Sequence, residues 1–194
     1  MNRDQIISFV QKQMPSKRWQ HTEGVRDSAV ILASQYGADA VKADIAAILH
    51  DVAKYMPIEE QRDMIKHTDA PTEILQYGFQ LWHAPVGAYI AEETCGITDQ
   101  AILDAIKYHT SGRVGMTVLD KVICVADYIE PNRSYPGVEQ IRELAKKSLD
   151  EALLAGLDST IEFLLEKGKK VYPQTIFSRN AIIDELNEAK YKNN

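Results

Sequence analysis

The chain lacks the features that mark secreted and membrane-spanning proteins. Cys95 and Cys124 are the only cysteines in 194 residues, too few for a disulfide framework and not spaced as a CxxC pair. No window approaches 18 uninterrupted apolar residues, which argues against a transmembrane helix. The charged opening stretch MNRDQIISFVQKQM has no apolar centre of the kind a signal peptide needs. These absences predict a cytoplasmic protein with no membrane partner.

Positive charge is also scarce. The formal net charge is −6, whereas a general nucleic-acid binder neutralises phosphates with clustered Lys and Arg side chains. We therefore expect no nucleic-acid polymer as a partner. A negatively charged protein that handles phosphate esters must supply local positive charge, either from metal ions or from a few basic residues.

Alternation of β-branched residues is nearly absent, and apolar residues recur instead at spacings of three and four. This pattern predicts helices, and 194 residues suit one domain. Ser16 and Asp39 are expected to be N-caps. We expect residues 149–194 to form a C-terminal helical extension packed on the main body. The predicted helical segments are 2–14, 17–36, 39–55, 58–68, 82–94, 98–108, 117–130, 137–147, 149–171 and 176–191.

The most informative helix runs through residues 44–54. At about 100° per residue, one arc is the apolar core face. The opposite arc carries Ala46, Ala47, His50, Asp51 and Lys54, and its small residues predict close packing against a neighbour. An ionised carboxylate in such a place needs a cation or dense hydrogen bonding, and a metal ion meets that need. Alone, however, the His50-Asp51 dipeptide is a weak signal, and a surface position would explain it.

Two further residues favour a metal site over a surface position for His50 and Asp51. The residues that follow His21 at spacings of three and four are mostly apolar, so His21 is expected to lie on the inward face of its helix. Asp127 follows Ile123 and Cys124 by four and three residues, so its carboxylate also points toward the interior. A core histidine and a helix-end carboxylate in water are the alternatives for these two positions.

His21, His50-Asp51 and Asp127 together resemble the H…HD…D signature of the HD superfamily of metal-dependent phosphohydrolases. The chain is most similar to the YqeK branch, the symmetrical diadenosine tetraphosphate hydrolases. Three stretches carry this likeness: LHDVAKY (49–55), KYHTSGR (107–113) and VADYIEPNRSYPGV (125–138). The resemblance implies an all-α fold, an HD-domain helical bundle, as a single domain over 1–194 with its metal-site core at 17–140.

The resemblance also implies the ligand set. His21, His50, Asp51 and Asp127 would hold one divalent ion, and Asp51 would bridge to a second ion held by His83 and His109. Iron is the first expectation for both ions, with manganese or zinc as alternatives. Helix capping is the alternative role for His83 and His109. The fifth histidine, His67, is interpreted as a surface residue.

The implied reaction is hydrolysis of a dinucleoside tetraphosphate at its centre, so that diadenosine tetraphosphate and water give two ADP. Asp51, Lys54 and His109 are the predicted catalytic residues. Lys54, Thr110, Arg113 and Arg133 are the predicted substrate-binding residues, because ammonium and guanidinium groups bind phosphate. Tyr108, Tyr128 and Tyr135 are candidates for stacking on a base, although buried positions in the core would also explain them.

Three alternatives stay open at this point. A phosphatase with a single metal ion would not need His83 and His109, and a cyclic dinucleotide phosphodiesterase would be expected to carry a GYP tripeptide after the HD segment, which is absent. A nucleotide-sensing module would bind metal and ligand without turnover. The long C-terminal helices make a homodimer possible.

Overall fold

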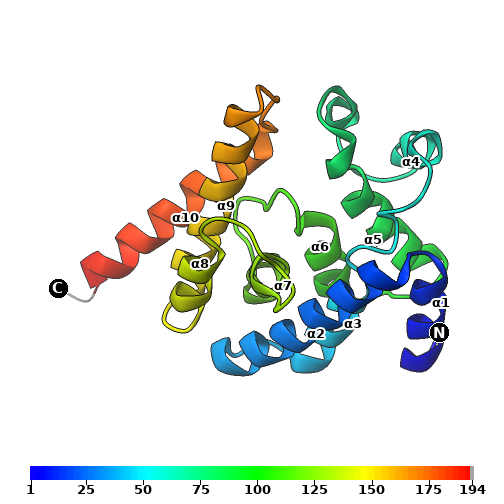
Figure 1. Ribbon diagram of the computed structural model, residues 1–194, viewed down its shortest axis with the longest axis horizontal. Helices are drawn as coiled ribbons and strands as arrows, with labels where there is room; N and C mark the ends of the chain where they lie inside the picture. Colours follow the sequence, from blue (N-terminus) through cyan, green and yellow to red (C-terminus); the bar gives the residue numbers. More distant parts are fainter. Residues whose placement is uncertain (193–194) are drawn as a thin grey trace.

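A computed structural model describes residues 1–192, and all regular structure in this range is helical. The predicted all-α fold is confirmed (Figure 1). Of the described helices, none is long and apolar enough to span a membrane. In chain order the elements are α1 (Arg3–Lys12), α2 (Ser16–Tyr36), α3 (Ala40–Leu49), α4 (Ile58–Ile65), the 3-10 segments η1 (Thr72–Gln76) and η2 (Phe79–Leu81), α5 (His83–Glu93), α6 (Gln100–Tyr108), α7 (Val118–Ile129), α8 (Val138–Ala145), α9 (Leu149–Glu166) and α10 (Pro173–Lys192).

Every predicted helix is present, but some boundaries differ. Asp39 is the N-cap of α3, since its side chain accepts from the backbone N–H groups of Val41 and Lys42. The expectation for Ser16 was wrong: Pro15 occupies the N-cap position of α2 and makes no side-chain cap. The segment between α4 and α5, for which no element was predicted, forms η1 and η2.

The third helix is shorter than predicted, and this displaces the HD pair. The α-helix ends at Leu49, so His50 and Asp51 lie at its C-terminal end and not in its middle. The His50 ring Nδ1 is 2.6 Å from the carbonyl oxygen of Ala47, which in a continuing α-helix would accept from the backbone of Asp51. Tighter turns follow, with Lys54 N–H donating to Asp51 C=O at 2.9 Å. The regular helix therefore ends just before His50 and Asp51.

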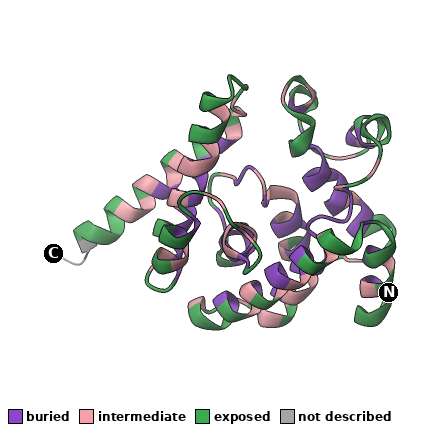
Figure 2. Ribbon diagram, viewed as in Figure 1, coloured by how far each residue is buried: buried purple, intermediate pink, exposed green. Residues whose placement is uncertain are grey.

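The second half of the α3 helix is enclosed by other helices. The helix packs on α1, α2, α5, α6 and α7, and every residue from 46 to 53 is buried. Ala46 and Ala47 are fully buried, so the arc that carries them is not solvated, as predicted. Figure 2 shows buried residues concentrated on the central helices, with exposed residues on the outer sides and along the far end of α10.

The C-terminal helices form a hairpin that packs on the rest of the fold through α9. This helix packs on α7 and α8, and α10 packs on α9. Lys121 of α7 holds both helices by donating to Asp150 at 2.7 Å and to Glu185 at 2.6 Å. The predicted segment 149–171 ends early, at Glu166, and residues 167–172 form the turn of the hairpin, which Gly168 enters at a φ of 60°. The far end of α10 extends away from the body (Figure 1).

Candidate metal centre

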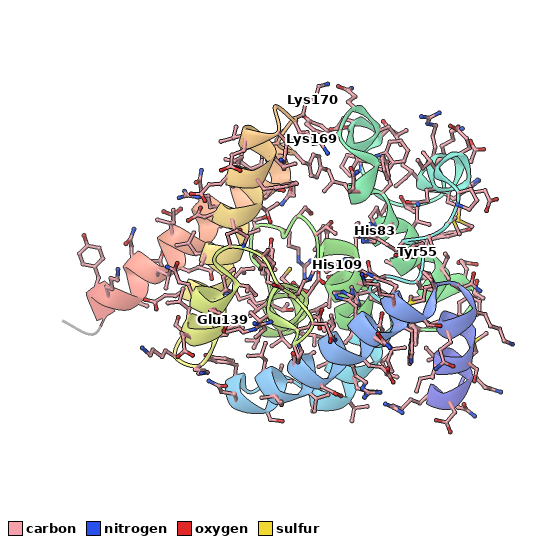
Figure 3. The ribbon with its side chains drawn as sticks, in the orientation of Figure 1. Tyr55, His83, His109, Glu139, Lys169 and Lys170 are labelled. Atoms are coloured by element: carbon pink, nitrogen blue, oxygen red, sulfur yellow. The ribbon has the colours of Figure 1, made fainter. Side chains whose placement is uncertain are left out.

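Four histidines and two aspartates converge from helix ends. His50 and His109 are the C-caps of α3 and α6, His83 is the first residue of α5, and His21 lies in the second turn of α2. Asp127 lies in the last turn of α7. Figure 3 places His83 and His109 in the middle of the molecule. All of these except Asp127, whose side chain is 18% exposed, are buried.

Asp51 divides the four imidazoles into two pairs. Its Oδ2 atom lies 3.0 Å from His50 Nε2 and 3.7 Å from His21 Nε2. Its Oδ1 atom lies 3.0 Å from His83 Nε2 and 3.9 Å from His109 Nε2. His21 Nε2 is also 3.0 Å from Asp127 Oδ1. Two groups of potential ligands, His21-His50-Asp51 and Asp51-His83-His109, therefore share one carboxylate.

The opposite nitrogen of three rings is already engaged. His50 Nδ1 donates to Ala47 C=O at 2.6 Å, and His109 Nδ1 donates to Ile106 C=O at 2.7 Å. His21 Nδ1 donates to the carboxylate of Glu130 at 3.0 Å. Because carbonyl and carboxylate oxygens only accept, these contacts place the proton on Nδ1 and leave a lone pair on Nε2. Such outer contacts are how proteins orient imidazoles that ligate metals.

The inner face of the cluster is therefore electron-rich and needs a cation. Lone pairs on His50 Nε2 and Asp51 Oδ2 face one another at 3.0 Å. His21 Nε2, His50 Nε2 and Asp51 Oδ1 are buried without a hydrogen-bond partner, a costly state for polar atoms. Mixed imidazole and carboxylate donors suit divalent transition metals. The residues present thus fit divalent metal ions.

Burial also keeps the imidazoles in the form that binds metal. It lowers the pKa of His50 and His83 well below the usual value and lowers the pKa of His109 to about 3, because a charged ring inside the protein loses its hydration. Neighbouring cationic groups act in the same direction on all three rings. At neutral pH these rings are neutral and able to act as ligands.

The HD domain family matches residues 18–132, a range that contains all six clustered residues. This chain belongs to the HD domain family. The expected membership in the HD superfamily is therefore confirmed, and the cluster around Asp51 is called the HD centre below.

Relatives of the same family match nearly the whole chain. One from Bacillus subtilis (strain 168) is 48% identical over 183 residues, covering 94% of this chain and 98% of the relative. Another, from Staphylococcus aureus, is 38% identical and covers 91% and 92%. Both are named symmetrical bis(5'-nucleosyl)-tetraphosphatase. A crystal structure of a predicted HD superfamily hydrolase involved in NAD metabolism from Clostridium acetobutylicum superposes with a TM-score of 0.90 at 37% identity, covering 95% of this chain and 98% of that one.

Three basic side chains surround the HD centre. Lys54 Nζ lies 3.8 Å from Asp51 Oδ1 and 3.3 Å from His83 Nε2. Arg133 donates to Asp127 Oδ1 at 2.6 Å, and Arg18 donates to Asp51 Oδ2. Burial, together with the charges of Arg18 and Arg133, lowers the pKa of Lys54 to about 8. Three positively charged groups close together produce a positive potential, which favours binding of an anion such as phosphate.

The carboxylate of Asp127 is held in its charged form. Burial alone would raise its pKa, but the charge of Arg133 holds that pKa well below the usual range. Arg133 bonds both the side chain and the backbone carbonyl of Asp127, at 2.6 and 3.0 Å. Its guanidinium thus anchors the last turn of α7 beside the HD centre.

The structure gives Arg113, which is expected to bind phosphate, two carboxylate partners, and its contact with phosphate stays a prediction. Its guanidinium pairs with Asp104 and Asp120, each at 2.8 Å, and lies 4.9 Å from the centre of the Tyr108 ring. Because its guanidinium group pairs with two carboxylates, Arg113 links the loop after α6 to the start of α7. Thr110 lies beside His109 and lines a pocket described below.

Two residues of the site were missed in the sequence. Arg18 precedes His21 by three residues, so both lie on one face of α2, and that spacing was the available signal. Glu130 begins the EPNR stretch and accepts from His21 Nδ1. Gly24 makes room for Glu130, because a Cβ atom there would lie 2.5 Å from its Oε2. Nothing in local sequence shows that this glycine and this glutamate meet.

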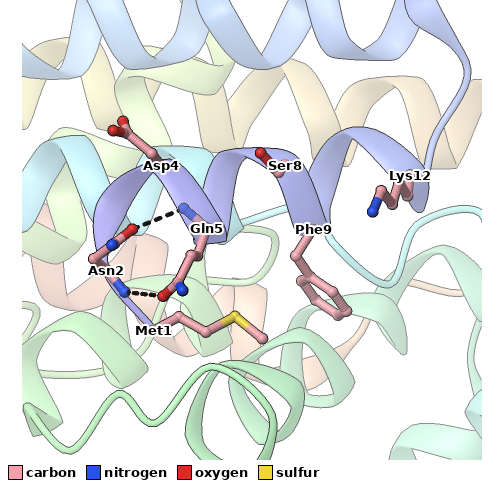
Figure 4. A pocket seen from close by; sticks show the side chains of 7 residues that line it. All are labelled: Met1, Asn2, Asp4, Gln5, Ser8, Phe9 and Lys12. Atoms are coloured by element: carbon pink, nitrogen blue, oxygen red, sulfur yellow. Dashed lines mark hydrogen bonds between the residues drawn. The ribbon is translucent and has the colours of Figure 1, made fainter.

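The remaining candidates make other contacts. Tyr128 and Tyr135 are packed in the fold, with the Tyr128 hydroxyl 2.8 Å from that of Thr160 and the Tyr135 hydroxyl donating to Tyr128 C=O. His67 is exposed, as expected. A hollow of about 440 Å³ lies along α1, where Asn2 and Gln5 form a capping box (Figure 4). It contains none of the clustered residues.

Proposed function

We propose that this HD-domain protein hydrolyses dinucleoside tetraphosphates at the centre, converting diadenosine tetraphosphate and water into two ADP. The bond that breaks joins the second and third phosphates; water supplies a hydroxyl group to one half and a proton to the other. The substrate class comes from the relatives, which match this chain nearly from end to end. The observation that carries the proposal is Asp51, whose two oxygens each face a pair of imidazoles.

The proposed cofactors are two divalent metal ions, with iron as the first expectation and manganese or zinc as alternatives. His21, His50, Asp51 and Asp127 would hold one ion, and Asp51, His83 and His109 the other. Two bound ions supply an activated water and withdraw charge from phosphoryl oxygens. The proton positions on the rings of His21, His50 and His109 leave Nε2 free to ligate, which supports this ligand set.

The proposed catalytic residues are Asp51, Lys54 and His109, where Asp51 and His109 act as ligands. Lys54 binds and orients a phosphate oxygen, since its ammonium is beside both Asp51 and His83 and its side chain is 31% exposed. Arg133 is 33% exposed and flanks the opposite side at Asp127. A polyphosphate can therefore reach both cations, and Arg18 adds a third positive charge. Thr110 is proposed to donate its hydroxyl to the same substrate.

The test is product analysis. Purified full-length protein loaded with Mn²⁺ or Fe²⁺ is incubated with diadenosine tetraphosphate, and the nucleotides are resolved by anion-exchange chromatography. We expect ADP as the single product, at two per substrate consumed. AMP plus ATP in equal amounts would contradict symmetrical cleavage. Absence of turnover in protein whose metal content is verified would contradict the enzymatic proposal and favour a sensing module.

The proposed setting is the cytoplasm, where the free thiols of Cys95 and Cys124 would stay reduced; both are buried. A homodimer is proposed for the molecule in solution. Light scattering coupled to size-exclusion chromatography checks the assembly, with a mass near twice 21.8 kDa expected and a mass near 21.8 kDa contradicting it.

A further inference from the structure

A pocket of about 230 Å³ lies between η1 and η2, the end of α6 and the start of α10; it is called the α6–α10 pocket below. Tyr108, Thr110 and Ser111 line it, and they flank His109 in the chain. Pro85, two residues after His83, also lines it. The walls are thus continuous in sequence with the two histidines that face Asp51 Oδ1. A group bound here would lie next to that half of the HD centre.

The lining suits a flat, uncharged group. Pro71, Ile74 and Leu81 contribute apolar surface, and Tyr108 and Tyr172 contribute aromatic rings. The one lysine in the wall, Lys107, is paired with Asp69 at 2.5 Å, so its charge is largely neutralised and the pocket is not a second phosphate site.

Polar groups are few and lie among this apolar surface. The hydroxyl of Thr110 and the amide of Gln174 are available for hydrogen bonds. An apolar and aromatic cavity with a small number of polar groups is typical of sites for cofactors and nucleotide bases.

The volume limits what the pocket can hold. Sites for complete drug-sized ligands measure roughly 300–1,000 Å³, and this pocket, at about 230 Å³, is smaller. It is therefore too small for a whole dinucleotide, and only part of such a ligand could enter it. The polyphosphate must then lie outside it, which is where Lys54 and the HD centre are found.

The C-terminal hairpin completes the pocket. Tyr172 and Gln174 lie beyond residues 18–132, the range that the HD domain family matches. The turn of the hairpin is tied to η1, because Lys170 Nζ donates to Gln76 C=O at 3.2 Å and Tyr172 lies edge-on to Tyr77 at 5.0 Å. Figure 3 shows Lys169 and Lys170 at this turn. The part of the chain outside the HD match thus supplies one wall.

From these observations we propose that the α6–α10 pocket binds the purine base and sugar of one half of the substrate, with its phosphates on the His83-His109 side of the HD centre. Tyr108 and Tyr172 provide the aromatic contacts. This inference rests on the proposed function for the identity of the nucleotide. It assigns the C-terminal hairpin a role in recognising the substrate.

The test compares two ligands that differ by a nucleoside. Isothermal titration calorimetry measures binding of ADP and of pyrophosphate to the Mn²⁺-loaded full chain. Wild-type protein is expected to bind ADP more tightly. Tyr172→Ala should weaken ADP binding about tenfold to a hundredfold, the range of one lost aromatic stack, and change pyrophosphate binding less than twofold. Ala70→Leu, which fills the pocket from its buried wall, should have the same selective effect.

Phe177→Ala is the matched control, since Phe177 is an aromatic residue of α10 only five positions after Tyr172, 57% exposed and outside the pocket; it should leave both affinities unchanged. The inference would be overturned if Tyr172→Ala and Ala70→Leu lost ADP and pyrophosphate binding equally, or if both variants bound ADP as the wild type does. The two proposals can fail separately. If the variants lose ADP binding selectively but the wild-type protein does not convert diadenosine tetraphosphate to ADP, the pocket binds a nucleoside and the proposed reaction is wrong.

Discussion

Asp51 lies between two pairs of imidazoles, with its side chain fully enclosed. Each carboxylate oxygen faces one pair, so the negative charge of this single residue serves both proposed ion sites. Each histidine, in contrast, contributes one nitrogen to one side. The consequences of removing Asp51 and of removing a histidine should therefore differ in kind.

The first prediction follows from this difference between Asp51 and the histidines. Asp51→Asn keeps the shape of the side chain but removes the charge, and we expect it to lose both ions, leaving less than about half an ion per chain, since anionic ligands dominate such sites. His109→Ala should lose about one ion and retain the other. Metal content is measured by inductively coupled plasma mass spectrometry after gel filtration.

His67→Ala is the control for both variants, because His67 is exposed and lies outside the HD centre. It should retain the wild-type metal content. Two ions per chain in Asp51→Asn would contradict the bridging role, and loss of both ions in His109→Ala would show that the two sites are not separable.

The helices α9 and α7 approach closely at Gly156. A Cβ atom at this position would lie 2.5 Å from ring carbons of Tyr128, so the absence of a side chain lets the hairpin pack on the body. Tyr128 also holds α9 through the hydroxyl of Thr160. Helix propensity opposes the choice of glycine, since alanine is favoured there by about 1 kcal/mol.

The prediction for these elements compares the steric cost of a side chain at position 156 with the gain in helix propensity. Gly156→Ala should lower the free energy of unfolding by about 1–3 kcal/mol, because overpacking outweighs the gain in propensity. Gly87→Ala is the matched control: it is also in a helix interior, and its Cβ atom would meet neighbours no closer than 3.5 Å. That variant should be neutral or more stable by about 0.5–1 kcal/mol. Urea denaturation followed by circular dichroism measures both, and a stabilised Gly156→Ala would contradict the packing argument.

At the scale of the whole molecule, the HD centre joins α2, α3, α5, α6 and α7, while α9 and α10 attach to α7 through Lys121. Ions that bind only the folded chain stabilise all of these elements together. We propose on this basis that residues 1–194 fold as one unit, with 17–140 as the metal-site core and 149–194 as its C-terminal extension.

Removing the metal should therefore lower the Tm of one transition and create no second one. With free Mn²⁺ at a hundred times its Kd, the added stability is about 2.7 kcal/mol per ion, or roughly 5–10 °C for a chain of this length. Differential scanning calorimetry in Mn²⁺ and in excess chelator measures the shift. Two transitions, of which only one responds to the chelator, would show that the C-terminal extension unfolds separately.

Much of the site could be predicted because helical periodicity and family spacing are local or nearly local signals. The inward direction of His21 and the all-helical fold follow from repeats of three and four residues. The C-terminal end of α3 could not be predicted in this way, because it depends on the His50 ring competing for a backbone carbonyl. The carboxylate partners of Arg113 could not be predicted for a similar reason: an arginine suits a phosphate equally well as the two carboxylates that the fold brings to it.

The sequence by itself determined the helical class, the residue types of the HD centre and the family that uses them, since these depend on chemistry repeated along the chain. Only the tertiary structure decided how Asp51 is shared between two imidazole pairs, that Glu130 and Gly24 meet behind His21, and that the C-terminal hairpin closes a pocket beside His109. Each of these is a contact between residues distant in the chain, and their distances are set by the packing of whole helices.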